Sequence, residues 1–189
     1  MRGVADDAPR AGWLPGLVHV PSPNFNARPH GVAVDLLVIH AISLPAGHYG
    51  GPWIRDLFLN RLNHAAHPSF EGLKGLRVSA HFLVSRGGES VQFVSIDERA
   101  WHAGVSRHGG REGCNDFSIG IELEGCDEDG FTDAQYAALS ALTRRLMRAC
   151  PRIVPDRIVG HADIAPGRKT DPGPYFDWLR YRAELQRPA

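Results

Sequence analysis

The sequence has few cysteines and no excess of either charge. Its three cysteines, Cys114, Cys126 and Cys150, are widely spaced and form no C-x-x-C pair, so we expect neither a disulfide framework nor a thiolate zinc site. Lysine plus arginine and aspartate plus glutamate number 21 each, a balance that favours neither a nucleic-acid backbone nor an anionic membrane surface as partner. An H-E-x-x-H motif is also missing, which argues against a zinc peptidase of that helical type.

Long apolar runs are missing as well. Residues 1–17 carry charges and prolines where a signal peptide would need an apolar core, and no segment approaches the length of a transmembrane helix. With 189 residues, of which 43% are hydrophobic, the chain is long enough for one buried core and short for two domains. We therefore expect a single cytoplasmic domain with no membrane or nucleic-acid partner, and we take it to be a monomer.

The order of the expected elements is mixed α/β. The segment 1–29 is Pro-rich and aperiodic, and we expect it to form an N-terminal arm packed on a domain of residues 30–189. Apolar patterns predict β-strands after it, and the sequence Arg-Gly-Gly-Glu at 86–89 predicts a hairpin between the second and third of them. The expected strands are 36–42, 78–85, 90–96, 117–124 and 158–160.

Three helices complete this reading of the chain. Pro suits the first position of a helix at 52–62, whose apolar residues follow at helical spacing. Thr132 and Gln135 form a capping box that opens a second helix, which Pro151 ends. A last helix is expected at 174–185. Long polar segments predict loops at 63–75 and 104–116.

The segment Gly160–Gly173 carries the strongest chemical signal. It places the imidazole of His161, the ammonium of Lys169 and the carboxylate of Asp171 on one loop that Pro and Gly make irregular. His40 ends an apolar run, where a buried strand would present it at the edge of a sheet. Two His and one Asp suit zinc and leave a fourth position for water, while a Lys suits a developing oxyanion. A hydrolase is therefore the leading interpretation.

A plainer interpretation exists for each histidine. A lone His40 would be taken as a core histidine with satisfied hydrogen bonds. His161, however, also follows a strand that ends in Gly, and two such strands beside an Asp make coincidence less plausible. His81, in the middle of the expected strand 78–85, is better explained by a structural role or by a place behind the metal site.

Glu122 is the candidate for acid–base chemistry. In the expected strand 117–124, alternate residues form an apolar face and a second face with Gly120, Glu122 and Glu124. A solvated face would explain the acids, but Gly120 leaves room for a group to approach the backbone. A carboxylate on an otherwise apolar strand suits proton transfer in a metal hydrolase. We expect Glu124 at the surface or behind the site, where replacement by alanine would have a mild effect.

Four further residues are candidates for substrate binding. Trp101 could belong to the core, but an indole beside His102 and a Gly also suits a groove wall that stacks on a sugar ring. His102 could line the same cleft. Arg168 adjoins the catalytic Lys candidate and suits a substrate carboxylate. Arg77, an ordinary surface charge by default, is kept with this group.

With these residues in place, the sequence closely resembles the zinc amidases that cleave N-acetylmuramoyl-L-alanine bonds, and among them the cytosolic AmpD type. The resemblance extends over nearly the whole chain. One departure is Ala41, where relatives usually carry Asn, and it concerns one substrate hydrogen bond rather than the metal site. The matching segments are Pro21–Asn24, Leu37–His40, Ile42–Pro45, Gly50–Pro52, Val78–His81, Ala100–Gly104, Cys114–Gly125 and Gly160–Gly173.

This resemblance implies a set of site residues and a fold. The zinc ligands would be His40, His161 and Asp171, holding one Zn²⁺ per chain, and Glu122 and Lys169 would be catalytic. The implied fold is a single α/β domain, in which helices flank a central mixed β-sheet with a zinc groove on one face.

The resemblance also implies a reaction. The substrate would be a muropeptide, cut between the lactyl group of 1,6-anhydro-N-acetylmuramic acid and the L-Ala of the stem peptide. In the cytosol this reaction serves peptidoglycan recycling, and it lowers the muropeptide signals that induce β-lactamase in some bacteria. A non-catalytic muropeptide-binding module on the same fold is the alternative. The presence of all three ligands with Glu122 and Lys169 argues against it.

Overall fold

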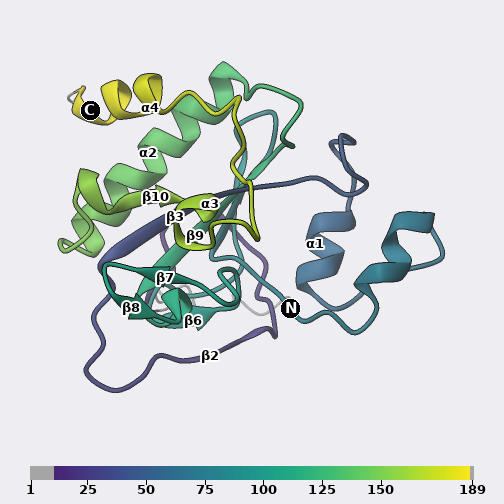
Figure 1. Ribbon diagram of the computed structural model, residues 1–189, viewed down its shortest axis with the longest axis horizontal. Helices are drawn as coiled ribbons and strands as arrows, with labels where there is room; N and C mark the ends of the chain where they lie inside the picture. The colour runs from purple at the N-terminus through teal and green to yellow at the C-terminus, as the bar shows by residue number, and fades with distance from the viewer. Residues whose placement is uncertain (1–10, 188–189) are drawn as a thin grey trace, which may run out of the picture.

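The computed structural model describes residues 11–187, and its centre is a six-stranded β-sheet (Figure 1). Every neighbouring pair of strands is parallel except β4 with β5, so the sheet is mixed. Helices flank it, and the expected fold class is confirmed. In sheet order the strands are β1 (Val18–His19), β5 (Ser90–Gln92), β4 (Phe82–Val84), β9 (Ser118–Glu124), β3 (Leu36–Ile42) and β10 (Ile158–Gly160).

The two longest strands, β3 and β9, lie side by side at the centre. They pair in parallel along their whole length, from Leu36 opposite Ser118 to Ile42 opposite Glu124. Alternate residues of β9 (Ile119, Ile121 and Leu123) pack into the main apolar core, as the alternation predicts. The intervening residues of β9 therefore face the other side of the sheet, which is free to carry polar groups.

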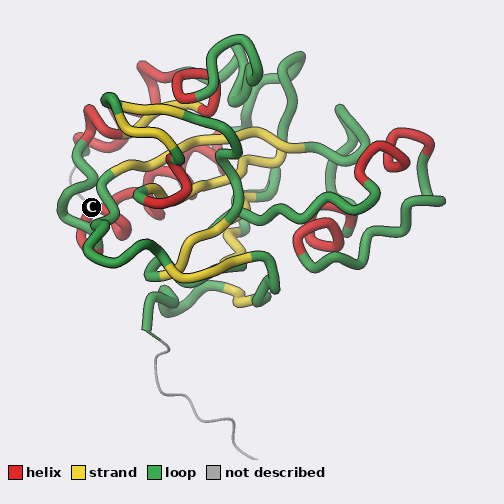
Figure 2. The backbone as a smooth tube through the Cα atoms, turned by 60° about the horizontal axis from the view of Figure 1, so that its bottom comes forward, coloured by secondary structure: helices red, strands yellow, loops and turns green. Residues whose placement is uncertain are grey.

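The longest helix covers the apolar face. This helix, α2 (Asp133–Ala149), begins with the expected capping box, in which Thr132 and Gln135 bond each other's backbone N–H. It packs with α4 (Trp178–Gln186) on one side of the molecule (Figure 1). At the opposite end lie α1 (Trp53–Phe58) and a 3-10 helix, Pro68–Leu73 (Figure 2). No helix within residues 11–187 has the length and apolar character needed to cross a membrane.

Several boundaries differ from the expected ones. The first helix ends at Phe58 instead of reaching Leu62, because Asn60 adopts a left-handed conformation (φ 59°) that no helix continues through. The last helix begins at Trp178, where the carboxylate of Asp177 accepts the backbone N–H of Arg180 at 2.9 Å and caps the helix. The hairpin between β4 and β5 is confirmed, with shorter strands than expected.

The expected loops also contain regular structure. The loop at 63–75 includes the 3-10 helix noted above, and the loop at 104–116 contains a small antiparallel hairpin. A further two-stranded sheet, β2 with β6, was not expected from the sequence. The additional elements are β2 (Phe25–Ala27), β6 (Glu98–Ala100), β7 (Arg107–His108), β8 (Arg111–Glu112), α3 (His161–Ile164) and two short 3-10 helices, Cys114–Asp116 and Pro155–Arg157.

The described part of the N-terminal segment, residues 11–29, is built into these sheets. It supplies β1 and β2, and Arg28 follows β2 into the interior. The guanidinium of Arg28 donates to four backbone carbonyls, and burial lowers its pKa to about 10, so the side chain remains a cation at neutral pH. Its acceptors are the carbonyls of Ile96, Asn115, Asp116 and Ser118, at 3.0–3.2 Å.

Glu124 is buried, which excludes the surface position, one of the two positions expected for it. Its side chain is at the end of β9, and the residue is only 5% exposed. One carboxylate oxygen accepts the backbone N–H of Gly50 at 2.6 Å, and the other accepts that of Arg86 at 3.0 Å. Glu124 thus ties the loop after β3 and the hairpin turn to the central strand.

We expect Glu124→Ala to destabilise the protein rather than to have a mild effect. The change would leave two backbone N–H groups without their acceptor, at a cost of roughly 1–3 kcal/mol in the free energy of unfolding. Urea denaturation would measure this cost, with the exposed Glu128 replaced by alanine as control. An equal, small effect of both changes would contradict this role for Glu124.

Candidate metal centre

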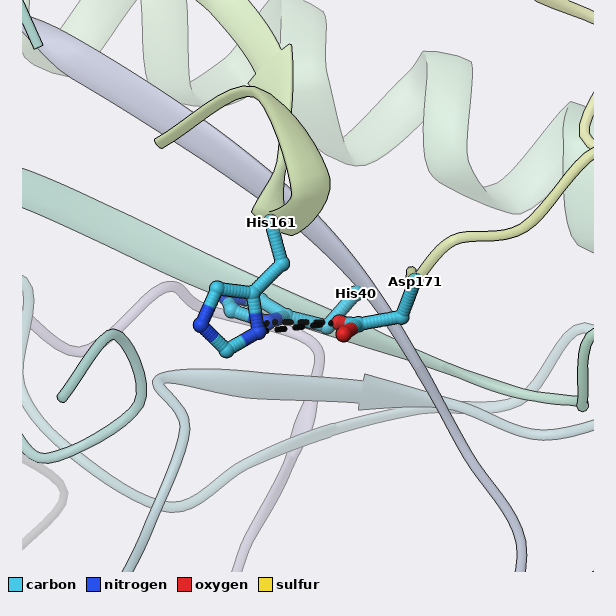
Figure 3. Close-up of side chains that lie close together, drawn as sticks. All are labelled: His40, His161 and Asp171. Atoms are coloured by element: carbon cyan, nitrogen blue, oxygen red, sulfur yellow. Dashed lines mark hydrogen bonds and ion pairs between the residues drawn. The ribbon is translucent and has the colours of Figure 1, made fainter. Parts of the chain in front are cut away.

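The topology of the sheet brings the candidate ligands together at the carboxyl ends of two parallel strands. β10 pairs with β3 so that Gly160 lies opposite Ile39, and the next residues along the two strands are His161 and His40. His161 is also the first residue of α3, directly after β10. The loop that follows α3 returns to the same place and supplies Asp171 (Figure 3). Its path is held by a hydrogen bond of 2.9 Å from the backbone N–H of Ala162 to the carbonyl of Asp171.

The facing atoms of these three residues lie close together. The Nδ1 atoms of His40 and His161 are 2.9 Å apart, and Oδ2 of Asp171 lies 3.1 Å and 3.0 Å from them respectively. His40 and His161 are almost fully buried, while Asp171 is partly exposed. Within residues 11–187, no other three His, Cys, Asp or Glu side chains gather in a group that could hold a metal ion.

The pKa shifts of His40 and Asp171 fit a cation between them. Burial lowers the pKa of His40 to about 4, so its imidazole is neutral at neutral pH. Burial alone would raise the pKa of Asp171, but the imidazole nitrogens of His161 and His40 outweigh it, and the pKa is lowered. Two imidazole nitrogens and one carboxylate oxygen thus converge on one point. This donor set is one that zinc accepts.

Glu122 lies beside this group. In the paired strands it is opposite His40 on one side and Leu83 on the other, so its side chain shares their face of the sheet. Its Oε2 is shielded from solvent and has no hydrogen-bond partner among the described residues. Burial, and then the charge of Asp171, raise the pKa of Glu122 well above its usual range, while Lys169 opposes them. Such a carboxyl group is suited to accept and return a proton.

Lys169 is exposed on the loop between α3 and Asp171. Its positive charge acts to lower the pKa values of both His40 and Glu122, although burial dominates at each of them. Its ammonium group is therefore close enough to be felt at both residues. An exposed ammonium beside the three convergent ligands can reach negative charge that develops on a substrate.

Two of the expected substrate-binding residues lie elsewhere than expected. His102 does not line an open cleft, because it is only 9% exposed and its ring packs behind that of His40. The guanidinium of Arg168 donates to the carbonyls of Ala103 at 2.7 Å and Val105 at 2.6 Å, and it lies against Gly104. Its Nη2 donors are thus used to hold a loop of the protein itself.

The other two expected residues are accessible. The indole N–H of Trp101 donates to the side chain of Asn26 at 2.7 Å, which fixes the orientation of a partly exposed ring. Arg77 is exposed in the segment before β4. His81 is fully buried, and its Nδ1 accepts the backbone N–H of Gly120 at 3.0 Å, in agreement with a structural role.

Sequence reasoning missed residues that act through the backbone. The side-chain oxygen of Asn115 accepts the N–H groups of His102 and Ala103, at 3.1 Å and 2.8 Å. The carbonyl of Ala103 in turn accepts from Nε2 of His161 at 3.2 Å. No pattern in the sequence marks such contacts, because any residue can supply a backbone carbonyl.

Known proteins with similar sequences and structures are amidases. The family model of N-acetylmuramoyl-L-alanine amidases matches residues 30–174. The 1,6-anhydro-N-acetylmuramyl-L-alanine amidase AmpD of Escherichia coli K12 is 57% identical over 176 residues, which are 93% of this chain and 96% of that protein. A crystal structure of a selenomethionine AmpD derivative superposes with a TM-score of 0.90 at 55% identity, covering 93% of this chain and 98% of the other.

A more distant structure contains a ligand. AmpDh3 of Pseudomonas aeruginosa, solved in complex with anhydromuramic pentapeptide, superposes with a TM-score of 0.60 at 30% identity. The alignment covers 82% of this chain and 61% of AmpDh3.

We expect the purified protein to bind one divalent metal ion per chain, and His40→Ala to abolish this binding while the protein stays folded. The core between the sheet and α2 does not include the metal ligands, so loss of a ligand should leave it intact. Elemental analysis and circular dichroism would measure both properties. The exposed His30, replaced by alanine, is the control. Full metal content in the His40 variant would overturn the ligand assignment.

Proposed function

The chain belongs to the N-acetylmuramoyl-L-alanine amidase family, and we propose that it hydrolyses the amide bond between 1,6-anhydro-N-acetylmuramic acid and the L-alanine of the stem peptide. The observation that carries this proposal is the convergence of His40, His161 and Asp171 beside the unpartnered carboxyl of Glu122. The name of the Escherichia coli relative and the anhydromuramic pentapeptide bound to AmpDh3 support the choice of substrate.

Zinc is the metal that we propose for this site. His40 and His161 would bind it through Nδ1 and Asp171 through a carboxylate oxygen, one ion per chain. When bound, zinc supplies Lewis acidity toward the scissile carbonyl and lowers the pKa of a water molecule to about 7. Three protein ligands leave a coordination position for that chemistry, which is the pattern of catalytic rather than structural zinc sites.

Glu122 provides the proton transfers in the proposed reaction. Its carboxylate takes a proton from the attacking water as the oxygen adds to the amide carbon. It returns this proton to the amide nitrogen as the C–N bond breaks, so that the products are the lactyl carboxylic acid, which then loses its proton to the solvent, and the free amino group of L-alanine. Burial raises the pKa of Glu122, which favours its holding the proton between the two steps.

Lys169 stabilises the oxyanion in this scheme. The tetrahedral intermediate carries a negative charge on the former carbonyl oxygen, and an ammonium lowers the energy of that charge as it develops. The exposed position of Lys169 lets it approach a bound substrate without leaving a buried charge in the free protein.

The other candidate residues concern substrate binding rather than the chemical step. Trp101 is proposed to stack on the sugar, with its ring held by Asn26. Arg77 is proposed to meet a carboxylate of the stem peptide. His102, which is buried behind His40, has no substrate contact in this proposal. Arg168 would reach a substrate only through donors not engaged with residues 103–105.

We place the reaction in the cytoplasmic recycling of anhydro-muropeptides, performed by a monomer in which residues 11–29 form an arm on the amidase domain; residues 1–10 of the expected arm lie outside the described residues. The name of the Escherichia coli relative supports a recycling role, and a decrease in muropeptides that induce β-lactamase would be a consequence. The alternative, a non-catalytic binding module, would need no general base. The unpartnered carboxyl of Glu122 beside the ligands favours the enzyme.

We expect Glu122→Gln to lower kcat by about 100-fold or more, because it removes a general base and leaves the shape of the side chain unchanged. KM and metal content should remain near those of the unaltered protein. Steady-state hydrolysis of an anhydro-muropeptide, followed by mass spectrometry, would measure the effect, with Glu128→Gln as the exposed control. Near-normal turnover of the Glu122 variant would favour a solvated strand carboxylate without a catalytic role.

Lys169→Met should lower kcat far more than it raises KM. The methionine keeps most of the side-chain length but loses the charge, and that charge stabilises the transition state more than the bound substrate. The same kinetic assay separates the two parameters. If only KM changed, Lys169 would be a binding residue, and the oxyanion would depend on the metal alone.

A further inference from the structure

A chain of polar groups lies behind His40, on the side away from the other ligands. Nε2 of His40 is 2.9 Å from Nδ1 of His102, and Nε2 of His102 is 3.2 Å from the hydroxyl of Ser118. The Ser118 hydroxyl in turn lies 2.6 Å from the backbone carbonyl of Cys114. Both ring nitrogens of His102 and the Nε2 of His40 therefore have a hydrogen-bond partner among these groups. The remaining nitrogen, Nδ1 of His40, is directed at the metal site.

The direction of the protons follows from the end of the chain. The carbonyl of Cys114 can only accept, so the Ser118 hydroxyl must donate its single hydrogen to it. The Ser118 oxygen then accepts from Nε2–H of His102, which leaves the Nδ1 of His102 without a proton if that ring is neutral. This bare nitrogen accepts from Nε2–H of His40. The Nδ1 of a neutral His40 is therefore also unprotonated, as a metal ligand must be.

The surroundings of the chain favour neutral rings. His40 and His102 are 1% and 9% exposed, and Ser118 is fully buried. A buried imidazolium would need a carboxylate partner, and no carboxylate is among the hydrogen-bond partners of His102 in the described residues. With one proton on each ring, the hydrogen-bond distances of the chain allow a single arrangement of donors and acceptors.

The fold makes a specific place for His102. A Cβ atom on Gly120 would lie 2.5 Å from Cγ of the His102 ring, so the ring occupies a slot that only glycine leaves open. Asn115 holds the backbone N–H of His102 at 3.1 Å and keeps the ring at this depth. Gly120 lies between Ser118 and Glu122 on the same face of β9, so one strand positions both the chain of polar groups and the proposed base.

The second imidazole reaches the same state through another partner. Nε2 of His161 donates to the carbonyl of Ala103 at 3.2 Å, so the single proton of a neutral ring would lie on Nε2 and not on Nδ1. His161 is thus oriented by one backbone group, which Arg168 also contacts. His40, by contrast, depends on two side chains that could each be replaced by mutation.

We propose that His102 and Ser118 are positioning residues that hold His40 in its Nε2–H tautomer and so present the Nδ1 electron pair to the metal. This inference rests on the proposed zinc amidase function. Metal-ligating histidines depend on such partners, and removal of a partner typically costs about 10–100-fold in metal affinity. The role is distinct from substrate contact, because both side chains are buried.

Zinc affinity of the full-length protein, measured by competition with a chromophoric chelator, tests this proposal. We expect His102→Leu to weaken zinc binding by about 10–100-fold, because Nε2–H of His40 loses its acceptor. His102→Asn can place an amide oxygen near the lost nitrogen and should restore part of the affinity. Ser118→Ala should also weaken binding, since His102 can then move its proton to Nδ1 and force the proton of His40 onto the metal-binding nitrogen.

A control and a second measurement separate positioning from general stability. Ser140 is as buried as Ser118 and bonds Glu184 between α2 and α4, so Ser140→Ala removes a buried hydroxyl without reaching the site. Nitrogen-15 chemical shifts of the metal-free protein report the His40 tautomer directly. We expect Nε2–H alone in the unaltered protein and in the Ser140 variant, and a mixture in the Ser118 variant.

The outcomes are distinguishable. Unchanged zinc affinity and an unchanged tautomer in both His102→Leu and Ser118→Ala would reject the positioning role of His102 and Ser118. The proposed amidase function would not be affected by that result. If His102→Leu did not fold, Ser118→Ala with its tautomer measurement would decide the question. Absence of zinc binding and of muropeptide hydrolysis in the unaltered protein would instead reject the proposed function itself.

Discussion

The parallel pairing of β3 with β9 and with β10 is the constraint on which the site depends. In a parallel sheet the carboxyl ends of neighbouring strands meet at one edge, and the register decides which side chains are neighbours. Here the register places His40 of β3 opposite Glu122 of β9. On the other side of β3, it places Gly160 of β10 opposite Ile39, so that His161, the next residue, lies near His40. A shift of one residue would turn each of these side chains to the opposite face. The apolar residues of β9, packed against α2, prevent such a shift.

The same alternation separates stability from chemistry. One face of β9 packs three aliphatic residues into the core, and the other carries Ser118, Gly120 and Glu122. Buried polar groups are tolerated when they have partners, and the histidines behind the site have theirs. Among the described residues, Oε2 of Glu122 has no such partner, and it lies on the same face as the metal ligand His40. The polar face of β9 thus carries the proposed chemistry, and the apolar face carries the core.

Loops complete the site, and charged side chains hold them by contacts with the backbone. Glu124 binds the N–H groups of two loops, Arg28 binds four carbonyls, and Arg168 binds the carbonyls on either side of Gly104. In each case a single side chain joins segments far apart in the sequence. These contacts explain why residues that look like surface charges in the sequence are integral to the structure.

Local pattern in the sequence was enough for several features. It predicts the strand 36–42, the capping box at Thr132, and the residue types of a metal site in the loop 160–173, because periodicity and turn chemistry depend on near neighbours. The end of α1 before Leu62, the burial of Glu124, and the places of His102 and Arg168 were decided only by the tertiary structure. Each depends on a backbone conformation or a partner that no local period encodes. His102, for example, is 62 residues from His40, and the two rings meet only because Gly120, on a third segment, leaves room for one of them.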